Sequence, residues 1–232
     1  MPTTAISATG VVKWFGEGEA RTMALREVSL DAYLGEMLYI VGPSGSGKTT
    51  LLSLISGILR PNDGSVFVED RDIWQLRSNE LAEFRLHKVG FVFQDYHLFP
   101  RLTTVENVAL PLILQKQDWD AAQRQALRYL EVVGLGKRAE LTPNRLSGGE
   151  QQRVAIARAI ASAPDIMIFD EPTASLDGDT GRKIVEFVRT EILSERRCII
   201  VVTHDDRIYG YADRILHMED GLLREGASAI HA

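Results

Sequence analysis

The stretch "MLYIVGPSGSGKTTLLSLISGIL", residues 37–59, decides the fold class of this 232-residue chain. A continuous apolar run at 37–41 leads into a glycine-rich turn at 42–49, and an apolar helical pattern follows the turn directly. This order of strand, turn and helix is the context in which the pattern G-x-x-x-x-G-K-[ST] binds phosphate groups. The stretch therefore predicts an α/β fold with a phosphate-binding loop.

Three further apolar runs resemble the first, at residues 89–93, 166–169 and 198–202. Continuous runs rich in Val, Ile and Phe are typical of strands buried on both faces of a parallel sheet. Each run ends in polar residues at its carboxyl end, where open parallel sheets bind their ligands. The polar residues that follow the three runs are Gln94, Asp170 with Glu171, and Thr203 with His204.

The glycine-rich turn provides the candidate phosphate-binding residues. These are Gly42, Pro43, Ser44, Gly45, Ser46, Gly47, Lys48, Thr49 and Thr50. The glycines allow successive backbone N–H groups to surround phosphate oxygens, Lys48 supplies a positive charge, and Thr49 offers a hydroxyl to Mg²⁺. The alternative interpretation is a glycine-rich turn with a purely structural role.

Two carboxylates end the third apolar run and suggest a catalytic role. Phosphoryl transfer needs positioning and charge neutralisation, so Asp170 is predicted to bind Mg²⁺ and Glu171 to polarise the attacking water. His204 could hydrogen-bond the terminal phosphate or that water, and Gln94 could complete the metal sphere. Without the phosphate-binding loop, such strand-end residues would be interpreted as solvated surface.

Trp14 and Phe15 are adjacent aromatic residues that we expect to lie upstream of the first strands. An aromatic face at this place could stack on a nucleotide base, an interaction worth about 1 to 3 kcal/mol. Packing in the core is an equal alternative, and the sequence does not choose between the two residues for stacking.

Composition limits the classes of function. The chain is 45% hydrophobic and 25% charged, and its net charge of −6 disfavours general attraction to nucleic acid or to an anionic membrane surface. The single cysteine, Cys198, lies in an apolar run and predicts neither disulfides nor a metal cluster. No apolar stretch approaches the roughly 18 residues of a membrane span, and the first ten residues do not resemble a signal peptide. We expect a protein of the cytoplasm.

Residues 95–160, between the second and third apolar runs, contain helix-like segments and predict a helical subdomain inserted into the α/β core. The core would then comprise 1–94 and 161–232 of a single domain, with an antiparallel β portion, a turn followed by a strand at 60–70, and a closing hairpin around Asp220 and Gly221. Within the helical part, "LSGGEQQR" (146–153) predicts a helix whose first turn carries two glycines.

Two glycines are unexpected in the first turn of a helix. Ser147 and Glu150 form a capping box, whereas Gly148 and Gly149 each cost about 1 kcal/mol in a helix relative to alanine. Glycine is expected where a backbone or ligand must approach closely, and a helix N-terminus attracts anions. The stretch is therefore a candidate phosphate contact, or only a capped helix.

Taken in order, "GPSGSGKTT", Gln94, "LSGGEQQR", "IMIFDEPTASLD" and His204 resemble the ATP-binding cassette (ABC) ATPase family over nearly the whole chain. The resemblance implies a RecA-like phosphate-loop nucleoside triphosphatase core that binds ATP and Mg²⁺ and hydrolyses ATP. It implies that Glu171 is the general base, that Gln94 senses Mg²⁺ and relays movement, and that His204 is the switch histidine.

The resemblance also implies a head-to-tail homodimer. Ser147, Gly148, Gly149 and Glu150 would contact the ATP held by the phosphate loop of the other subunit. Ser175, Leu176 and Asp177 match the dimer-contact loop of the family. The family usually places a tyrosine on adenine, and this chain has Trp14 and Phe15 as candidates instead.

Within the family, the stretches "GEGEARTMALREVSL" and "GFVFQDYHLFPRLTTVENVALPL" look most like the branch with macrolide exporters and lipoprotein-release complexes. This likeness implies an ATPase subunit at the cytoplasmic face of the membrane that powers a separate transmembrane permease for export or extraction, with no nucleic-acid partner. The alternative is a soluble ABC ATPase acting on the ribosome or DNA. Relatives of that kind carry coiled-coil arms, zinc-binding cysteines or two cassettes, which this sequence lacks.

Overall fold

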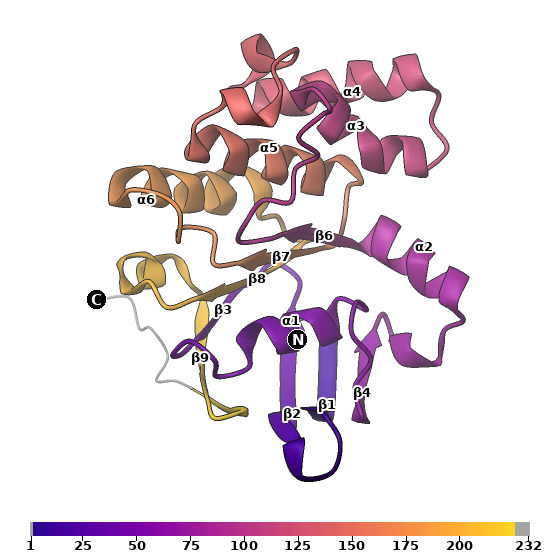
Figure 1. Ribbon diagram of the computed structural model, residues 1–232, viewed down its shortest axis with the longest axis vertical. Coiled ribbons are helices and arrows are strands. Elements are labelled where there is room, and N and C mark those ends of the chain that lie inside the picture. The colour runs from indigo at the N-terminus through magenta and orange to yellow at the C-terminus, as the bar shows by residue number, and fades with distance from the viewer. Residues whose placement is uncertain (1, 226–232) are drawn as a thin grey trace.

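The computed structural model describes residues 2–225, except the side chain of Glu19, and is built around a six-stranded sheet (Figure 1). Its strands, in spatial order, are β10 (Leu222–Glu225), β9 (Arg214–Glu219), β3 (Met37–Val41), β8 (Cys198–Thr203), β7 (Ile166–Asp170) and β6 (Val89–Val92). The strands from β9 to β6 run parallel, and β10 returns antiparallel to β9. The four apolar runs are thus confirmed as neighbouring parallel strands. The outer limits of the expected domain, residues 1 and 232, lie outside the described residues.

A second, antiparallel sheet lies at the lower end of Figure 1. Its order is β2 (Thr22–Tyr33), β1 (Thr4–Phe15), β4 (Asp63–Val68) and β5 (Arg71–Asp72). The expectation that Trp14 and Phe15 precede the first strands is wrong, because they are the last two residues of β1. The pairing of β1 with β2 contains several register shifts, which remove the regular alternation by which a half-buried strand is recognised.

Helices cover both faces of the six-stranded sheet, as its buried strands require. The helix α1 (Lys48–Ile55) packs between the two sheets in one apolar core, together with residues of β1, β2, β7 and β8. On the other face, α5 (Gly148–Ala161) and α6 (Gly178–Phe187) complete a second core (Figure 1). The sheet is therefore the middle layer that carries both the phosphate loop and the catalytic strand ends.

A third core lies at the top of Figure 1, where α3 (Thr104–Leu114) and α4 (Trp119–Val132) pack on α5. Thr103 caps α3 by accepting a hydrogen bond from the Glu106 N–H at 3.3 Å, and Asp118 caps α4 by accepting one from Ala121 at 3.0 Å. Pro111 lies inside α3. The helix α2 (Ser78–Lys88) leads directly into β6. The helices α3, α4 and α5 lie between β6 and β7 in the chain, whereas α2 precedes β6.

Short turns connect the larger elements. Single-turn 3₁₀ helices span Gly18–Ala20, Ile73–Gln75, Gly136–Arg138 and Pro143–Arg145, a longer one spans Asp206–Tyr211, and a π turn (Val188–Ile192) extends α6. The predicted closing hairpin is confirmed between β9 and β10, where Asp220 and Gly221 have φ values of 48° and 75°. Among residues 2–225, no helix is both long enough and apolar enough to cross a bilayer.

Candidate active site

The phosphate loop is held in shape by close backbone approach at its glycines. Gly47 is the N-cap of α1 with a φ of 106°, a conformation that L side chains rarely adopt. A Cβ at Gly47 would lie 2.5 Å from the carbonyl oxygen of Ala24, and one at Gly42 would overlap the carbonyl oxygen of Met218. The loop is therefore wedged between β2 and β9, and both glycines are required by the fold itself.

Lys48 is buried within this loop, with 6% of its surface exposed. Its Nζ donates hydrogen bonds to the carbonyl oxygens of Gly42 at 2.8 Å and Pro43 at 2.9 Å. Burial lowers the pKa of the Lys48 amine, while the Glu171 and Asp170 carboxylates act to raise it. A desolvated cation in a loop of N–H groups is suited to bind an anion.

Thr49 and Asp170 meet at the carboxyl end of β7. The Thr49 hydroxyl donates to Asp170 Oδ1 at 3.2 Å, and only 6% of Asp170 is exposed. Burial raises the pKa of the Asp170 carboxyl, and the hydrogen bond from Thr49 opposes that shift. A hydroxyl beside a carboxylate is an oxygen donor set of the kind that Mg²⁺ prefers, and a metal ion would balance the buried charge of Asp170.

Glu171 and His204 contact each other at the ends of neighbouring strands β7 and β8. The Nδ1 of His204 lies 2.8 Å from Glu171 Oε1, and the backbone N–H of His204 donates to Glu171 Oε2 at 3.3 Å. Glu171 has a φ of 50°, which is unusual for a residue other than glycine. This backbone turn directs the carboxylate toward His204, although the two residues are 33 positions apart in the sequence.

One cavity of about 300 Å³ brings together nine of the predicted site residues, and Asp170 is not among those that line it. Its lining consists of Ala24, Ser44, Gly45, Gly47, Lys48, Thr49, Thr50, Gln94, Glu171 and His204. Residues of the phosphate loop thus share a cavity with three strand-end side chains. The arrangement can hold a phosphate chain at one wall and a water near Glu171 at the other.

The stretch 146–153 lies outside this cavity. At the start of α5, the Ser147 hydroxyl accepts from the Glu150 N–H at 3.3 Å, and Glu150 Oε2 accepts from the Ser147 N–H at 2.9 Å. Glu150 also accepts a hydrogen bond from Arg138 Nε at 3.1 Å. The predicted capping box is confirmed. The side chains of Ser147 and Glu150 form hydrogen bonds within the first turn of α5, and Glu150 also bonds to Arg138 of the 3₁₀ turn Gly136–Arg138.

The two glycines of this turn have different surroundings. A Cβ at Gly149 would lie 2.8 Å from Thr180 Cγ2 of α6, whereas one at Gly148 would meet its neighbours at 3.5 Å or more. Packing against α6 is a sufficient reason for glycine at 149. At 148 the chain offers no such reason, so the case for close approach by a ligand rests on Gly148.

The predicted dimer-contact loop, 175–177, leads into α6. Asp177 is the N-cap of this helix and accepts hydrogen bonds from the N–H groups of Asp179 at 3.2 Å and Thr180 at 3.0 Å. Ser175 and Leu176 lie near Gly148, because the Ser175 carbonyl oxygen and Leu176 Cδ2 are 3.6 and 3.7 Å from the position of a Cβ there. The loop 175–177 and the first turn of α5 are therefore neighbours in the structure.

The two aromatic candidates differ in exposure. The guanidinium of Arg21 lies 3.7 Å from the centroid of the Trp14 ring and covers one of its faces. Phe15 is 47% exposed and pairs with Thr22, two residues from the cavity-lining Ala24. The aromatic ring with the more accessible surface near the phosphate loop is that of Phe15.

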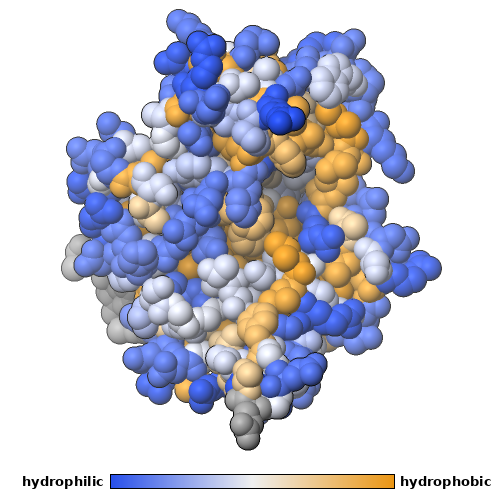
Figure 2. Space-filling view, in the orientation of Figure 1, coloured by the Kyte–Doolittle hydropathy of each residue, from blue (hydrophilic) through white to orange (hydrophobic). Residues whose placement is uncertain are grey.

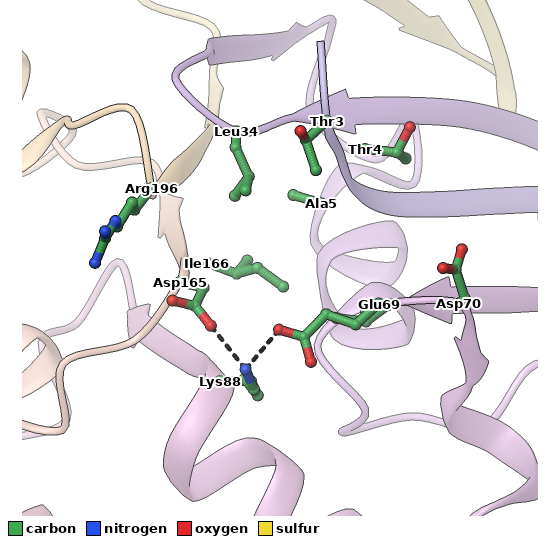
Figure 3. Close-up of a pocket in the computed structure, with 11 residues that line it drawn as sticks. Thr3, Thr4, Ala5, Leu34, Glu69, Asp70, Lys88, Asp165, Ile166 and Arg196 are labelled. Carbon is green, nitrogen blue, oxygen red and sulfur yellow. Dashed lines mark hydrogen bonds and ion pairs between the residues drawn. The ribbon is translucent and has the colours of Figure 1, made fainter. Parts of the chain in front are cut away.

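A second cavity, of about 560 Å³, contains none of the predicted site residues. In Figure 3 the ammonium group of Lys88 points toward two carboxylates, those of Glu69 at 2.5 Å and Asp165 at 2.9 Å. Glu69 follows β4 and Asp165 precedes β7, so the ion pairs join the antiparallel sheet to the core. We interpret Lys88 as a structural residue whose ion pairs link the two sheets.

The sequence analysis did not identify several residues that form hydrogen bonds next to the predicted site residues. Thr173, Asp205 and Arg207 form hydrogen bonds beside Glu171 and His204. Arg158 of α5 donates to the backbone oxygens of His97 at 2.6 Å and Tyr96 at 2.7 Å, just after Gln94. The contact of Thr173 with Asp205 and those of Arg158 join segments far apart in the sequence, so no sequence pattern pointed to them.

The fold and the cavity together define a phosphate-loop ATPase. The profile of the family described as "ABC transporter" matches residues 25–174. Across 95% of its length, the chain is 42% identical to an uncharacterized ABC transporter ATP-binding protein of Methanocaldococcus jannaschii, of which it covers 98%. The chain therefore belongs to the ABC transporter family, and it is an ATPase of that family.

Two named relatives come from Shewanella. The lipoprotein-releasing system ATP-binding protein LolD of Shewanella frigidimarina is 42% identical, with 92% of this chain and 90% of that protein covered. The macrolide export ATP-binding/permease protein MacB of Shewanella sp. (strain W3-18-1) is 38% identical over 96% of this chain, which spans 34% of that longer protein.

Solved structures show the same fold. A dimeric post-hydrolysis state of the ATP-binding cassette MJ0796, bound to ADP and Pi, matches with a TM-score of 0.90 and 37% identity, covering 98% of this chain and all of that chain. The protein cbiO1 from Clostridium perfringens, part of the ABC transporter complex cbiONQ, matches with a TM-score of 0.84 and 27% identity, covering 96% of this chain and 87% of that chain.

Proposed function

We propose that this chain is the ATP-hydrolysing subunit of an ABC transporter, that it dimerises head-to-tail around two ATP molecules, and that it powers a separate membrane protein. The observation that carries the proposal is the separation of two phosphate-binding features. Lys48 lines the nucleotide cavity, whereas Gly148 belongs to a helix start that this cavity does not include. A second copy, turned head to tail, would bring the missing feature to each ATP.

Within one subunit, the phosphate loop would hold the phosphate groups, and Phe15 would stack on adenine. The glycine-rich backbone from Gly42 to Thr50 supplies N–H donors, and Lys48 supplies the charge that the outer phosphates need. We choose Phe15 over Trp14 because its ring is exposed, whereas one face of Trp14 is covered by Arg21.

Mg²⁺ would be held by Thr49 and Asp170, with Gln94 completing the set from across the cavity. Oxygen ligands and a buried carboxylate fit this ion. Among residues 2–225, no group of three or more His, Cys, Asp or Glu side chains could hold a metal, so phosphate oxygens of the nucleotide would supply further ligands. When bound, Mg²⁺ would neutralise charge on the phosphates.

Glu171 would act as the general base toward the attacking water, with His204 beside it. The hydrogen bond between His204 Nδ1 and Glu171 Oε1 orients the carboxylate, which must be placed within hydrogen-bond reach of the water that it polarises. Ser147, Gly148, Gly149 and Glu150 of the partner would close the opposite side of the ATP, and Asp177 would lie in the dimer contact.

The membrane partner would dock in an apolar groove of about 620 Å³ between the core and the helical region. Figure 2 shows apolar surface gathered around this hollow, near α3 and the edge of the sheet at β6. Phe91, Phe93 and Phe99 contribute to its lining, and its charged lining residues are Arg85 and Arg158. The groove includes the segment that follows Gln94, so movement at the nucleotide would reach the partner there.

Likeness to LolD and MacB supports export or extraction from the membrane as the direction of work. The chain would then reside at the cytoplasmic face of the membrane, attached through its permease. The proposed division is a core of 1–94 and 161–232 with the helical subdomain 95–160 between the two parts. The negative net charge supports the absence of nucleic acid among its partners.

The test is a pull-down from detergent-solubilised membranes with tagged Glu171→Gln chain and ATP, a variant expected to hold the ATP-bound state. The matched control is Lys48→Ala combined with Glu171→Gln, which lacks the charge on the phosphates. A membrane protein retained by the first variant and lost from the second supports the proposal. Recovery of only ribosomal or DNA-associated proteins would instead support the soluble ATPase.

A further inference from the structure

Asp205, which directly follows His204, joins the two catalytic strand ends. Its Oδ2 accepts a hydrogen bond from the Thr173 hydroxyl at 2.9 Å. Thr173 lies two residues after Glu171 and is 2% exposed. Asp205 therefore fixes the loop that follows Glu171 to the loop that carries His204, across the junction of β7 and β8.

Arg207 extends this connection toward α6. Its side chain donates to Asp205 Oδ1 and Oδ2, each at 2.7 Å, and its backbone N–H donates to Oδ1 at 3.1 Å. The Arg207 Nη1 atom lies 2.7 Å from where a Cβ of Gly178 would stand, so the guanidinium covers the first residue of α6. Asp177, the N-cap of that helix, belongs to the loop expected at the dimer contact.

Thr173, the buried member of this connection, has little freedom to move. The Thr173 Cγ2 methyl packs against Gly181, 3.0 Å from where a Cβ of that glycine would stand, which leaves the Thr173 hydroxyl facing Asp205. The hydrogen bonds from Arg207 lower the pKa of Asp205 to about 2, so its carboxylate is charged at neutral pH. A charged acceptor that is saturated with donors holds its partners more firmly than a neutral one.

We propose that Asp205 is a positioning residue for ATP hydrolysis. Through Thr173 it holds the loop that follows Glu171 against the loop that carries His204. Through Arg207, whose guanidinium lies over Gly178, it places both loops beside Asp177 at the start of α6. This inference rests on the proposed roles of Glu171 and Asp177. Its consequence is that the general base is placed correctly only when the loop toward the second subunit is also in place. Loss of the connection lowers kcat and the cooperativity of the two sites, and leaves ATP binding intact.

Two substitutions at Thr173 separate the hydroxyl from the rest of the side chain. Thr173→Val removes the donor to Asp205 and keeps the methyl that packs on Gly181, whereas Thr173→Ser keeps the hydroxyl and loses that methyl. We expect Thr173→Val to lower kcat at least about tenfold, because small misplacements of catalytic groups are costly. The KM for ATP should stay within about twofold, and Thr173→Ser should keep near wild-type kcat.

A purely structural role for Thr173 predicts the opposite ranking. In that case Thr173→Ser would lose thermal stability and activity, and Thr173→Val would keep both. The measurements are kcat, KM and the Hill coefficient for ATP hydrolysis, with melting temperature and binding of a fluorescent ATP analogue as checks of folding. Equal kcat in Thr173→Val and wild type would overturn the inference.

A double substitution and a reference variant complete the test. Asp205→Ala should reduce kcat with little change in KM, and adding Thr173→Val should cause no further loss, because the alanine variant already lacks the acceptor of the Thr173 hydrogen bond. Additive losses would also overturn the connection. Glu171→Gln in the same assay keeps the two ideas apart. If that variant hydrolyses ATP normally, the proposed base is wrong, whereas if it is inactive and Thr173→Val is normal, only the role of Asp205 is wrong.

Discussion

Two glycine-bearing turns start the helices α1 and α5, and their surroundings differ. In the first turn, Gly47 is enclosed by the Ala24 carbonyl oxygen and two side chains, and Lys48 is buried and donates hydrogen bonds to the carbonyl oxygens of its own loop. In the second, Ser147 is exposed, and a Cβ at Gly148 would meet its nearest neighbours at ordinary contact distances of 3.5 Å or more. The first turn is thus shaped entirely by contacts within the chain, whereas the start of α5 would, in the proposed function, complete the ATP site of a second chain.

The largest effect is expected for a substitution of Glu171, in the part of the site that a single chain forms. Glu171→Gln should lower the rate of ATP hydrolysis by about 10² to 10⁴, the range of a lost general base, while ATP binding remains. A steady-state phosphate-release assay measures the rate, and Glu186→Gln on the exposed face of α6 is the charge-matched control. Hydrolysis at the wild-type rate would remove Glu171 as the base.

The next effect concerns the affinity of the phosphate loop. Lys48→Ala should weaken ATP binding about 100-fold, because a charge-assisted contact in a desolvated site is worth roughly 1.5 to 3 kcal/mol. Titration with a fluorescent ATP analogue measures the affinity. Lys183→Ala, an exposed lysine on α6, should bind as wild type does. Unchanged affinity in Lys48→Ala would show that the loop binds phosphate without this cation.

A smaller effect distinguishes the two glycines of the second turn. Gly149→Ala should destabilise the fold by about 1 to 3 kcal/mol, because its Cβ would press on Thr180 at 2.8 Å. Gly148→Ala, whose Cβ meets its neighbours at 3.5 Å or more, should fold with near wild-type stability. Chemical denaturation of both variants measures the difference. Equal loss of stability would mean that both glycines serve the fold alone.

The smallest effect is expected at the aromatic end of β1. Phe15→Ala should weaken ATP binding about tenfold, in keeping with roughly 1 to 3 kcal/mol for stacking of a base. Trp14→Ala is the matched comparison and should have the smaller effect on affinity, because Arg21 covers one face of its ring. If Trp14→Ala is the variant with weaker binding, the assignment of the stacking residue is reversed.

The sequence predicted the parts of the fold whose physics is local. Continuous apolar runs gave the parallel strands, and Ser147 with Glu150 gave the capped start of α5. The strand that ends in Trp14 and Phe15 was missed, because β1 pairs with β2 through shifted register and shows no regular alternation. The capping box explained the helix start but did not reveal that Gly149 serves packing on α6, a tertiary contact.

The same limit applies to the site. Residues attached to the glycine-rich loop or to strand ends were predicted, because the edge of a parallel sheet gathers them. Thr173 and Asp205 were not, because their hydrogen bond depends on β7 lying beside β8 and joins residues 32 positions apart. Both residues lie close to predicted site residues in the sequence, but their pairing with each other becomes visible only in the structure.

The most direct test of the account is the ATP-dependent mass of two purified variants, measured by analytical ultracentrifugation. Glu171→Gln should sediment as a monomer without nucleotide and as a dimer with ATP. Glu171→Gln combined with Gly148→Asp should bind ATP with the same affinity and remain a monomer, because the added carboxylate would stand against the phosphates of the partner's ATP. A double variant that dimerises as readily as Glu171→Gln alone would contradict the claim that the start of α5 completes the site of a second chain.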